Sequence, residues 1–232
     1  MAKNENKAQQ QDEVDKMNNV LSVTEQWIED NQKWIITAIV VIIAVVAGYL
    51  ALRHFYLEPR GEQARAEMYK GEIYLERDSF NLALNGDGGD YLGFKAIADK
   101  YSNTTAGNLA KAYAGICCYN LGNNEEALEY FKKYDGDDDI FATNITGMIG
   151  NCYANMGEYD LAIKNFVKAA DKADNELTSP IFLKKAAVVA EKKGDYAKAI
   201  KFYEEIKDDY SNSYVGRDID KYIERAKLLS GK

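Results

Sequence analysis

A run of 19 residues without a charged side chain, Trp34–Leu52, constrains this 232-residue chain more than any other feature. As a helix it would be about 28 Å long at ~1.5 Å per residue, close to the ~30 Å hydrocarbon core of a bilayer. Trp34 and Tyr49 stand near its ends, where a ring with a polar atom favours the headgroup layer. The run therefore predicts a single transmembrane helix over residues 34–52.

Two other interpretations of the run are open. A helix buried in a soluble domain would also be apolar, but such helices usually show a polar stripe, and here Thr37 is the one polar residue among the aliphatic ones. A signal peptide could be cleaved after Ala47, but 33 residues precede the run, and it exceeds the ~7–15 residues of a signal peptide core. We expect an uncleaved anchor after an N-terminal tail, residues 1–33, in which residues 12–31 show the spacing of a short amphipathic helix.

The composition argues against several classes of function. The formal charge is −8 and we find no stripe of Lys and Arg, so a nucleic acid partner is not expected. The single histidine, His54, adjoins the apolar run, so no histidine triad or histidine metal cluster can form. Cys117, Cys118 and Cys152 are odd in number and lack C-x-x-C spacing, which favours buried free thiols. We expect no enzyme activity, no cofactor, no metal and no small-molecule substrate.

Beyond the run, the sequence repeats itself. Gly122, Gly157 and Gly194 stand at equivalent places in LGNNEEALEYFKKY, MGEYDLAIKNFVKA and KGDYAKAIKFYEEI, 35 and 37 residues apart. An alanine follows each glycine by five residues and an aromatic residue follows it by nine, while glycine or alanine precedes it by seven. A glycine can end one helix, and small residues let two helices approach closely. Each period therefore predicts a helix pair that must stack on its neighbours to complete a core.

A fourth, degenerate period precedes these three. Gly89 lies 33 residues before Gly122, but Phe94 stands where the later repeats have alanine. The stretch rich in Gly, Asn and Asp around Gly89 predicts a loop insertion. A capping helix is expected at the other end, because the last repeat of a solenoid has no neighbour. The predicted boundaries are 58–107 for the first repeat, 108–212 for three regular repeats and 213–232 for the capping helix.

The pattern resembles the tetratricopeptide repeat (TPR) family, whose helix–turn–helix unit has a period of about 34 residues. The tryptophan-type residue of that family is replaced by Lys111, Thr146 and Leu183, and the terminal proline is absent. The resemblance implies an all-α fold, in which a single transmembrane helix precedes a TPR-like α-solenoid of about four helix pairs with a C-terminal capping helix.

The same resemblance implies that the protein binds other proteins in a groove lined by the first helix of each repeat. By register with the family, the groove residues are Tyr119, Asn120, Asn144, Asn151, Asn155, Lys184 and Glu191. The clamp with which some members hold a terminal carboxylate is not expected here, because Ala112, Ile116 and Met148 occupy its first positions. The alternative is that these polar side chains are simply exposed helix faces.

The layout resembles the ancillary subunit of the bacterial Sec translocon. That resemblance implies a single-pass protein of the bacterial inner membrane, with its N-terminus in the cytoplasm and its TPR domain in the periplasm. It would act as an adaptor or scaffold for the translocon, periplasmic chaperones or their clients. The flanking charges favour the opposite orientation, because four Lys or Arg residues follow the run within about 20 residues and two precede it. A cytoplasm-facing adaptor, or a structural scaffold of another envelope complex such as cytochrome maturation or division machinery, remains an alternative.

Overall fold

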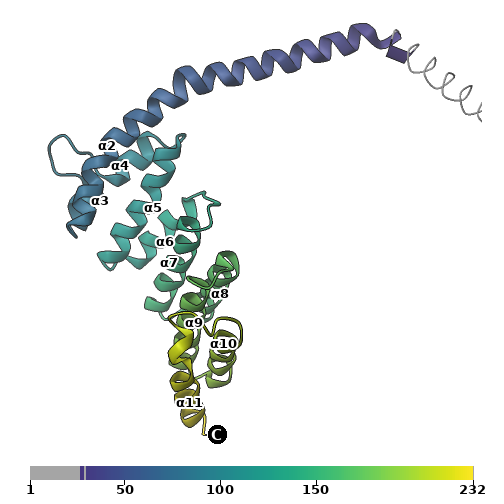
Figure 1. The fold of residues 1–232 in the computed structure, drawn as a ribbon. Coiled ribbons are helices and arrows are strands. Elements are labelled where there is room, and N and C mark those ends of the chain that lie inside the picture. Colours follow the sequence, from purple (N-terminus) through teal and green to yellow (C-terminus); the bar gives the residue numbers. More distant parts are fainter. Residues whose placement is uncertain (1–26, 29, 232) are drawn as a thin grey trace, which may run out of the picture. The chain divides into compact units, whose positions relative to one another are not determined.

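The computed structural model describes residues 27–28 and 30–231, which lie in helices and the turns between them, with no strand among them (Figure 1). The predicted fold class is confirmed: one long apolar helix near the N-terminus is followed by helical repeats. The chain divides after Leu57 into two compact units, and each is described by itself. The amphipathic helix predicted within residues 12–31 lies outside the described residues except at its C-terminal end.

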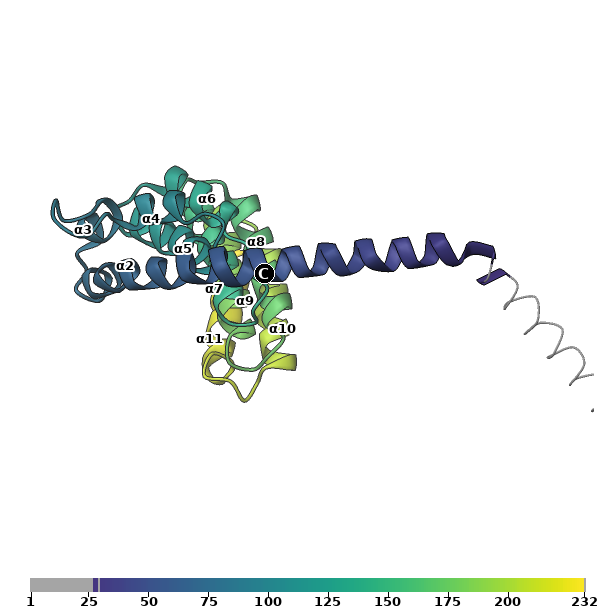
Figure 2. The same cartoon turned by 90° about the horizontal axis from the view of Figure 1, so that it is seen from above.

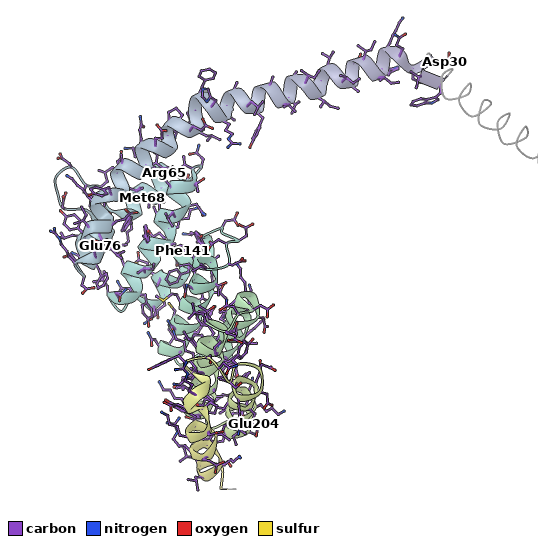
Figure 3. The ribbon with its side chains drawn as sticks, in the orientation of Figure 1. Asp30, Arg65, Met68, Glu76, Phe141 and Glu204 are labelled. Atoms are coloured by element: carbon purple, nitrogen blue, oxygen red, sulfur yellow. The ribbon has the colours of Figure 1, made fainter. Side chains whose placement is uncertain are left out.

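In the first unit, residues 30–52 form an α-helix and Arg53–Leu57 a π-helical turn. The apolar side chains of this helix are exposed; Ile42, for example, is 62% exposed. The helical stretch Asp30–Glu76, whose first and last residues are labelled in Figure 3, contains a window long and apolar enough to cross a membrane. Length and composition thus make it a candidate membrane span.

The second unit consists of antiparallel helices that pack on their neighbours in chain order (Figures 1 and 2). α5 packs on α6, α7 on α8 and α9 on α10, and α8 also packs closely on α9, so the pairs form a continuous stack. The helices are α2 (Glu58–Glu76), α3 (Phe80–Asn85), α4 (Phe94–Lys100), α5 (Thr105–Asn120), α6 (Asn124–Lys133), α7 (Phe141–Asn155), α8 (Tyr159–Ala173), α9 (Ser179–Lys193), α10 (Tyr196–Asp209) and α11 (Ile219–Leu229).

In the α5–α6 and α7–α8 pairs, a glycine of the first helix lies beneath an aromatic ring of the second. A Cβ added to Gly150 of α7 would lie 2.7 Å from the Phe166 ring of α8, so the two helices can approach only because that atom is missing. The turn between them needs a left-handed residue, and Gly157 supplies it with φ of 82°. The spacing read from the sequence therefore has the expected physical cause in this pair.

The first repeat has a different register from the one predicted. α2 ends in a turn in which the Ser79 N–H donates to the Tyr74 carbonyl oxygen at 2.8 Å, and the same type of bond closes α5, α7 and α9. The left-handed residue of this turn is Asp78 (φ 54°), and Gly89 lies in a later loop. The alignment on glycine was wrong here, because Asp is one of the other residues that adopt this conformation.

Two more positions of the first repeat fall into register once Asp78 is the reference. Ala83, five residues later, is fully buried, as are the alanines of the other repeats. Gly71, seven residues earlier, lies beneath two rings, since an added Cβ would be 2.7 Å from both the Tyr91 and the Phe94 ring. The sequence predicted that Phe94 replaces the small residue of the second helix. Instead, Phe94 belongs to the aromatic pair that covers Gly71.

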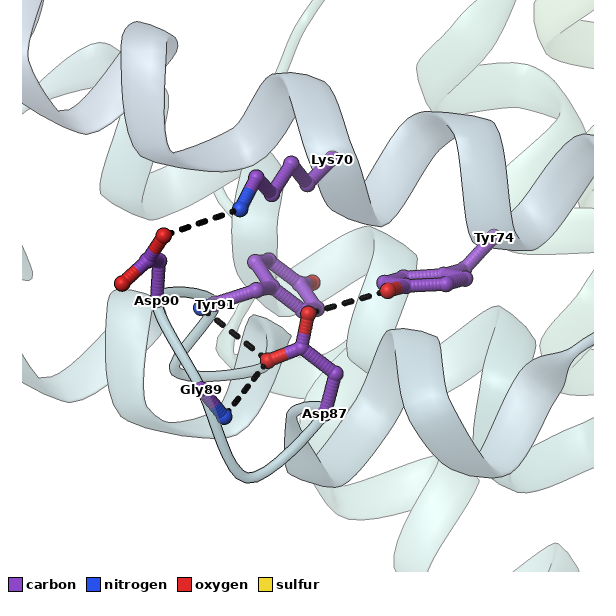
Figure 4. A network of polar contacts seen from close by, with 6 residues as sticks. All are labelled: Lys70, Tyr74, Asp87, Gly89, Asp90 and Tyr91. Atoms are coloured by element: carbon purple, nitrogen blue, oxygen red, sulfur yellow. Dashed lines mark hydrogen bonds and ion pairs between the residues drawn. The ribbon is translucent and has the colours of Figure 1, made fainter.

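The predicted insertion is present as the loop between α3 and α4, and Asp87 holds it in place (Figure 4). One carboxylate oxygen of Asp87 accepts from the backbone N–H groups of Gly89 at 2.9 Å and Tyr91 at 3.2 Å. The other accepts from the Tyr74 hydroxyl at 2.9 Å. These hydrogen bonds lower the pKa of the Asp87 carboxyl. The loop is thus bound to α2 through Tyr74, and α4 follows it in the helical stack.

The C-terminal helix α11 covers the last pair by packing on α10. Ile219, Ile223 and Ala226 form its buried face. Glu191 of α9 and Arg225 of α11 form an ion pair at 2.5 Å, which joins the last repeat to this helix.

Candidate interaction groove

The first helices of the later pairs enclose a hollow of about 470 Å³, a volume within the range of ~300–1,000 Å³ that ligand pockets occupy. It is formed by α5, α7 and α9, with contributions from α8 and from the segment before α11. Its polar lining consists of Tyr119, Asn151, Asn155, Lys184 and Lys185. Its apolar lining consists of Ala154, Phe166, Ile181, Val188, Val189, Tyr214 and Val215.

A second hollow of about 230 Å³ adjoins the first along α7. Its apolar walls include Ile116 of α5, Met148 of α7 and Phe182 of α9, and Phe141 (labelled in Figure 3) stands at the start of α7. Asn151 and Lys185 line both hollows, so they lie where the two meet. We call the two hollows together the groove.

The structure brings five of the seven predicted groove residues into the groove. Tyr119, Asn151, Asn155 and Lys184 line the larger hollow, and Asn144 lines the smaller one. Two of these side chains have structural partners: the Asn155 amide donates to the Asn124 side chain at 3.1 Å, and the Asn144 amide donates to the Ile140 carbonyl oxygen at 2.9 Å.

The other two predicted residues do not line either hollow. The Asn120 amide donates to the Ile116 carbonyl oxygen one turn earlier, at 2.8 Å. Glu191 is drawn away from the groove by its ion pair with Arg225, and its side chain is 12% exposed. Its role in the structure is to join α9 to α11.

Several residues that line the groove were missed by the sequence analysis, among them Lys185, Val188 and Tyr214. Val188 lies one helical turn beyond Lys184, so the 3.6-residue period of α9 could have indicated it. Tyr214 belongs to the connection before α11 and is 91% exposed, and no helical register predicts the position of such a residue. Lys185 directly follows Lys184, and the family register assigns only Lys184 to the groove.

Lys185 has an unusual environment for a lysine of this protein. It is half-buried, and its ammonium donates to the Asn151 side-chain oxygen at 3.3 Å. Its Nζ lies 5.7 Å from the ring centre of Phe166 and 5.9 Å from that of Phe182. Burial lowers the pKa of Lys185, because the low-dielectric surroundings disfavour the charged form. Among the described residues, no carboxylate lies within ion-pair distance of this ammonium.

Lys184, which lines the larger hollow, contacts an aromatic ring of the C-terminal helix. Its Nζ lies 4.2 Å from the ring centre of Tyr222 on α11, an arrangement that favours a cation over an aromatic face. Lys184 also lowers the pKa of the Tyr222 hydroxyl, chiefly through a side-chain hydrogen bond. The groove therefore combines apolar walls with two ammonium groups and with amides, which suits binding of a polypeptide.

The groove holds no arrangement of side chains for metal binding. Among residues 27–28 and 30–231, no three His, Cys, Asp or Glu residues are placed to hold a metal ion. The thiols of Cys117, Cys118 and Cys152 are buried, and burial raises the pKa of each to about 12. These cysteines serve as small apolar core residues.

Comparison with known proteins supports the interpretation of the groove. No curated protein matches the chain. The tetratricopeptide repeat family model matches residues 148–214, which extend from α7 to the connection before α11. TPR repeats are a protein-interaction fold. The segment that carries most of the groove is therefore similar to the tetratricopeptide repeat family.

Proposed function

We propose that this protein is a membrane-anchored TPR adaptor that binds segments of partner proteins in its groove. The observation that carries the proposal is the larger hollow of about 470 Å³ on the first helices of the solenoid, with apolar walls and a small number of polar groups. Pockets of this composition take up apolar side chains and fix their orientation through a few hydrogen bonds. The candidate membrane span would raise the local concentration of the groove near a membrane partner.

For the location we propose the bacterial inner membrane, with the N-terminus in the cytoplasm and the repeats in the periplasm. The proposal rests on the resemblance of the layout to the ancillary subunit of the Sec translocon. The translocon and periplasmic chaperones or their clients are accordingly the proposed partners. A cysteine placed at exposed Asp137 would test the orientation with a membrane-impermeant maleimide, since the native cysteines are buried. Labelling of intact spheroplasts supports a periplasmic domain, whereas labelling that requires permeabilisation contradicts it.

Photo-crosslinking in the native membrane tests the adaptor function itself. A photoreactive amino acid is placed in the groove at Val188 or Tyr214, and at exposed Lys168 on α8 as the control. We expect partner adducts at the groove positions and none at Lys168. Adducts confined to Lys168 would contradict groove binding and favour a scaffold that uses its outer face.

A further inference from the structure

Lys185 and Asn151 lie together at the junction of the two hollows, and we call this pair the cradle. Lys185 Nζ donates to the Asn151 oxygen at 3.3 Å. An ammonium group can only donate hydrogen bonds, so the Asn151 side chain must turn its oxygen, and not its nitrogen, toward Lys185. The amide nitrogen of Asn151 then faces the Met148 sulfur at 3.5 Å, and a thioether is a weak acceptor. The junction therefore offers two donors, the Lys185 ammonium and the Asn151 amide. A carboxylate would bind them more strongly than their present partners, the Asn151 oxygen and the Met148 sulfur.

The charge of the rest of the chain makes this cradle distinctive. Carboxylates outnumber cationic side chains, and the formal charge is −8. Several other lysines lie against one of these carboxylates, such as Lys95, whose ammonium is 2.6 Å from Glu126. Lys185 carries its charge in a half-buried apolar surrounding, where a charge without an opposite partner is costly. Charge complementarity thus points to an acidic group supplied from outside the second unit.

We propose that the groove binds one stretch of a partner protein in which an Asp or Glu side chain contacts Lys185 and Asn151 and is flanked by apolar side chains that enter the two hollows. The proposal rests on the adaptor function above and names the chemistry of the ligand. The flanking apolar residues follow from the lining, since the carboxylate position lies between the walls formed by Val188 and Met148. A net charge of −8 disfavours nucleic acid and anionic lipid as the source of the acidic group.

Selection from random peptides of about a dozen residues tests the proposal without a known partner. The full chain in detergent micelles is the target, and the peptides are displayed between fixed flanks so that they have no free terminal carboxylate. The target variants are Lys185→Gln, Lys185→Arg and Val188→Trp, the last of which fills the larger hollow. Lys168→Gln is the matched control, because it removes the same charge from the exposed face of α8. Melting curves establish that each variant is folded.

We expect the wild-type chain and the Lys168→Gln control to enrich peptides with an acidic residue between apolar ones. Lys185→Gln should abolish the acidic preference and Lys185→Arg should retain it. Replacing the acidic residue of a selected peptide by its amide should weaken binding by about tenfold, as expected for loss of a charge-assisted hydrogen bond. On Lys185→Gln the acidic peptide and its amide should bind equally.

The remaining outcomes separate this inference from the adaptor function. Peptides that are enriched without an acidic preference and are blocked by Val188→Trp would overturn the acidic ligand and leave groove binding intact. An acidic preference that survives in Lys185→Gln would also overturn it, because another cation would then be responsible. If Val188→Trp blocks none of the enriched peptides, or if no peptide is enriched, the groove is not a binding site. That result would overturn both the acidic ligand and the adaptor function.

Discussion

Phe131 of α6 covers Gly115 of α5 so closely that a Cβ added to this glycine would lie 2.6 Å from the ring. Gly115→Ala should therefore destabilise the second unit by about 1–3 kcal/mol, the cost of overpacking a core. The measurement is the unfolding midpoint in urea by circular dichroism. Gly61→Ala is the control, because the nearest atom to an added Cβ there is 4.0 Å away. This control should stabilise α2 by about 0.5–1 kcal/mol, and similar losses in both variants would contradict the packing argument.

Asp78→Gly should stabilise the chain, because Asp78 adopts the left-handed conformation in a turn where the three later repeats have glycine, at Gly122, Gly157 and Gly194. We expect a gain of about 0.5–1 kcal/mol, since this conformation costs an L-residue up to ~1–2 kcal/mol and Asp somewhat less. Asp78→Ala should have the opposite sign. A thermal melt of both variants decides the matter, and a loss of stability in Asp78→Gly would show that the carboxylate matters more than the backbone.

Arg225→Ala should loosen α11 from the last repeat, because it leaves the Glu191 carboxylate without the partner that lies 2.5 Å away. We expect a loss of about 1–2 kcal/mol, less than the ~3–5 kcal/mol of a fully buried pair, since the Arg225 side chain is 49% exposed. Native-state hydrogen exchange of α11 reports it. A double-mutant cycle with Glu191→Gln isolates the pair. Breaking the exposed pair of Lys193 with Asp160 by Lys193→Ala should have no measurable effect.

The three native thiols should resist alkylation in the folded chain. Burial raises the pKa of each to about 12, so the reactive thiolate is rare at pH 8. Mass spectrometry after iodoacetamide treatment should show Cys117, Cys118 and Cys152 unmodified in buffer and modified in urea. Because the folded pKa is raised above the ordinary 9.0, the stability that these thiols contribute is complete below pH 9 and lost as the pH rises towards 12. Rapid labelling of the folded chain would contradict this burial.

Lys185→Met should raise the melting temperature at neutral pH by up to about 2 °C, a small gain because the half-buried Lys185 side chain keeps part of its surface in solvent. Burial lowers the pKa of Lys185 below 10.5. Between that lowered value and 10.5 the unfolded chain binds more protons, so the wild-type chain gains stability as the pH rises through this window. The variant should lack this dependence. Differential scanning calorimetry from pH 7 to pH 10 measures both effects, and a destabilised variant would indicate that the ammonium is already paired in the native state.

The regular repeats could be predicted from the sequence because their turns use glycine and their helix contacts use small residues. The first repeat could not, since Asp78 adopts the conformation of glycine without any distinctive sequence pattern. In the regular repeats, the buried alanine and the aromatic residue lie on the same helix. In the first repeat, the loop after α3 separates Ala83 from Tyr91 and Phe94, whose rings cover Gly71. An insertion of this kind removes the helical period on which the alignment relied.

The groove was predictable where it follows helix register and unpredictable where it depends on tertiary contacts. Asn151 and Lys184 lie on the inner faces of α7 and α9, which the repeat period assigns. Glu191 has an equally suitable position, but Arg225 of another helix engages it, and this competition is visible only in three dimensions. Tyr214 reaches the groove from an irregular connection.

Asn151 and Lys185 meet although they belong to successive repeats, 34 residues apart. The contact is therefore a property of the junction between two units, and neither unit contains it alone. A deletion of one whole repeat could leave a well-folded, shorter stack whose new junction no longer joins an amide to a lysine. A solenoid can change its number of repeats without loss of fold, and in this protein that number would decide whether Lys185 and Asn151 meet at all.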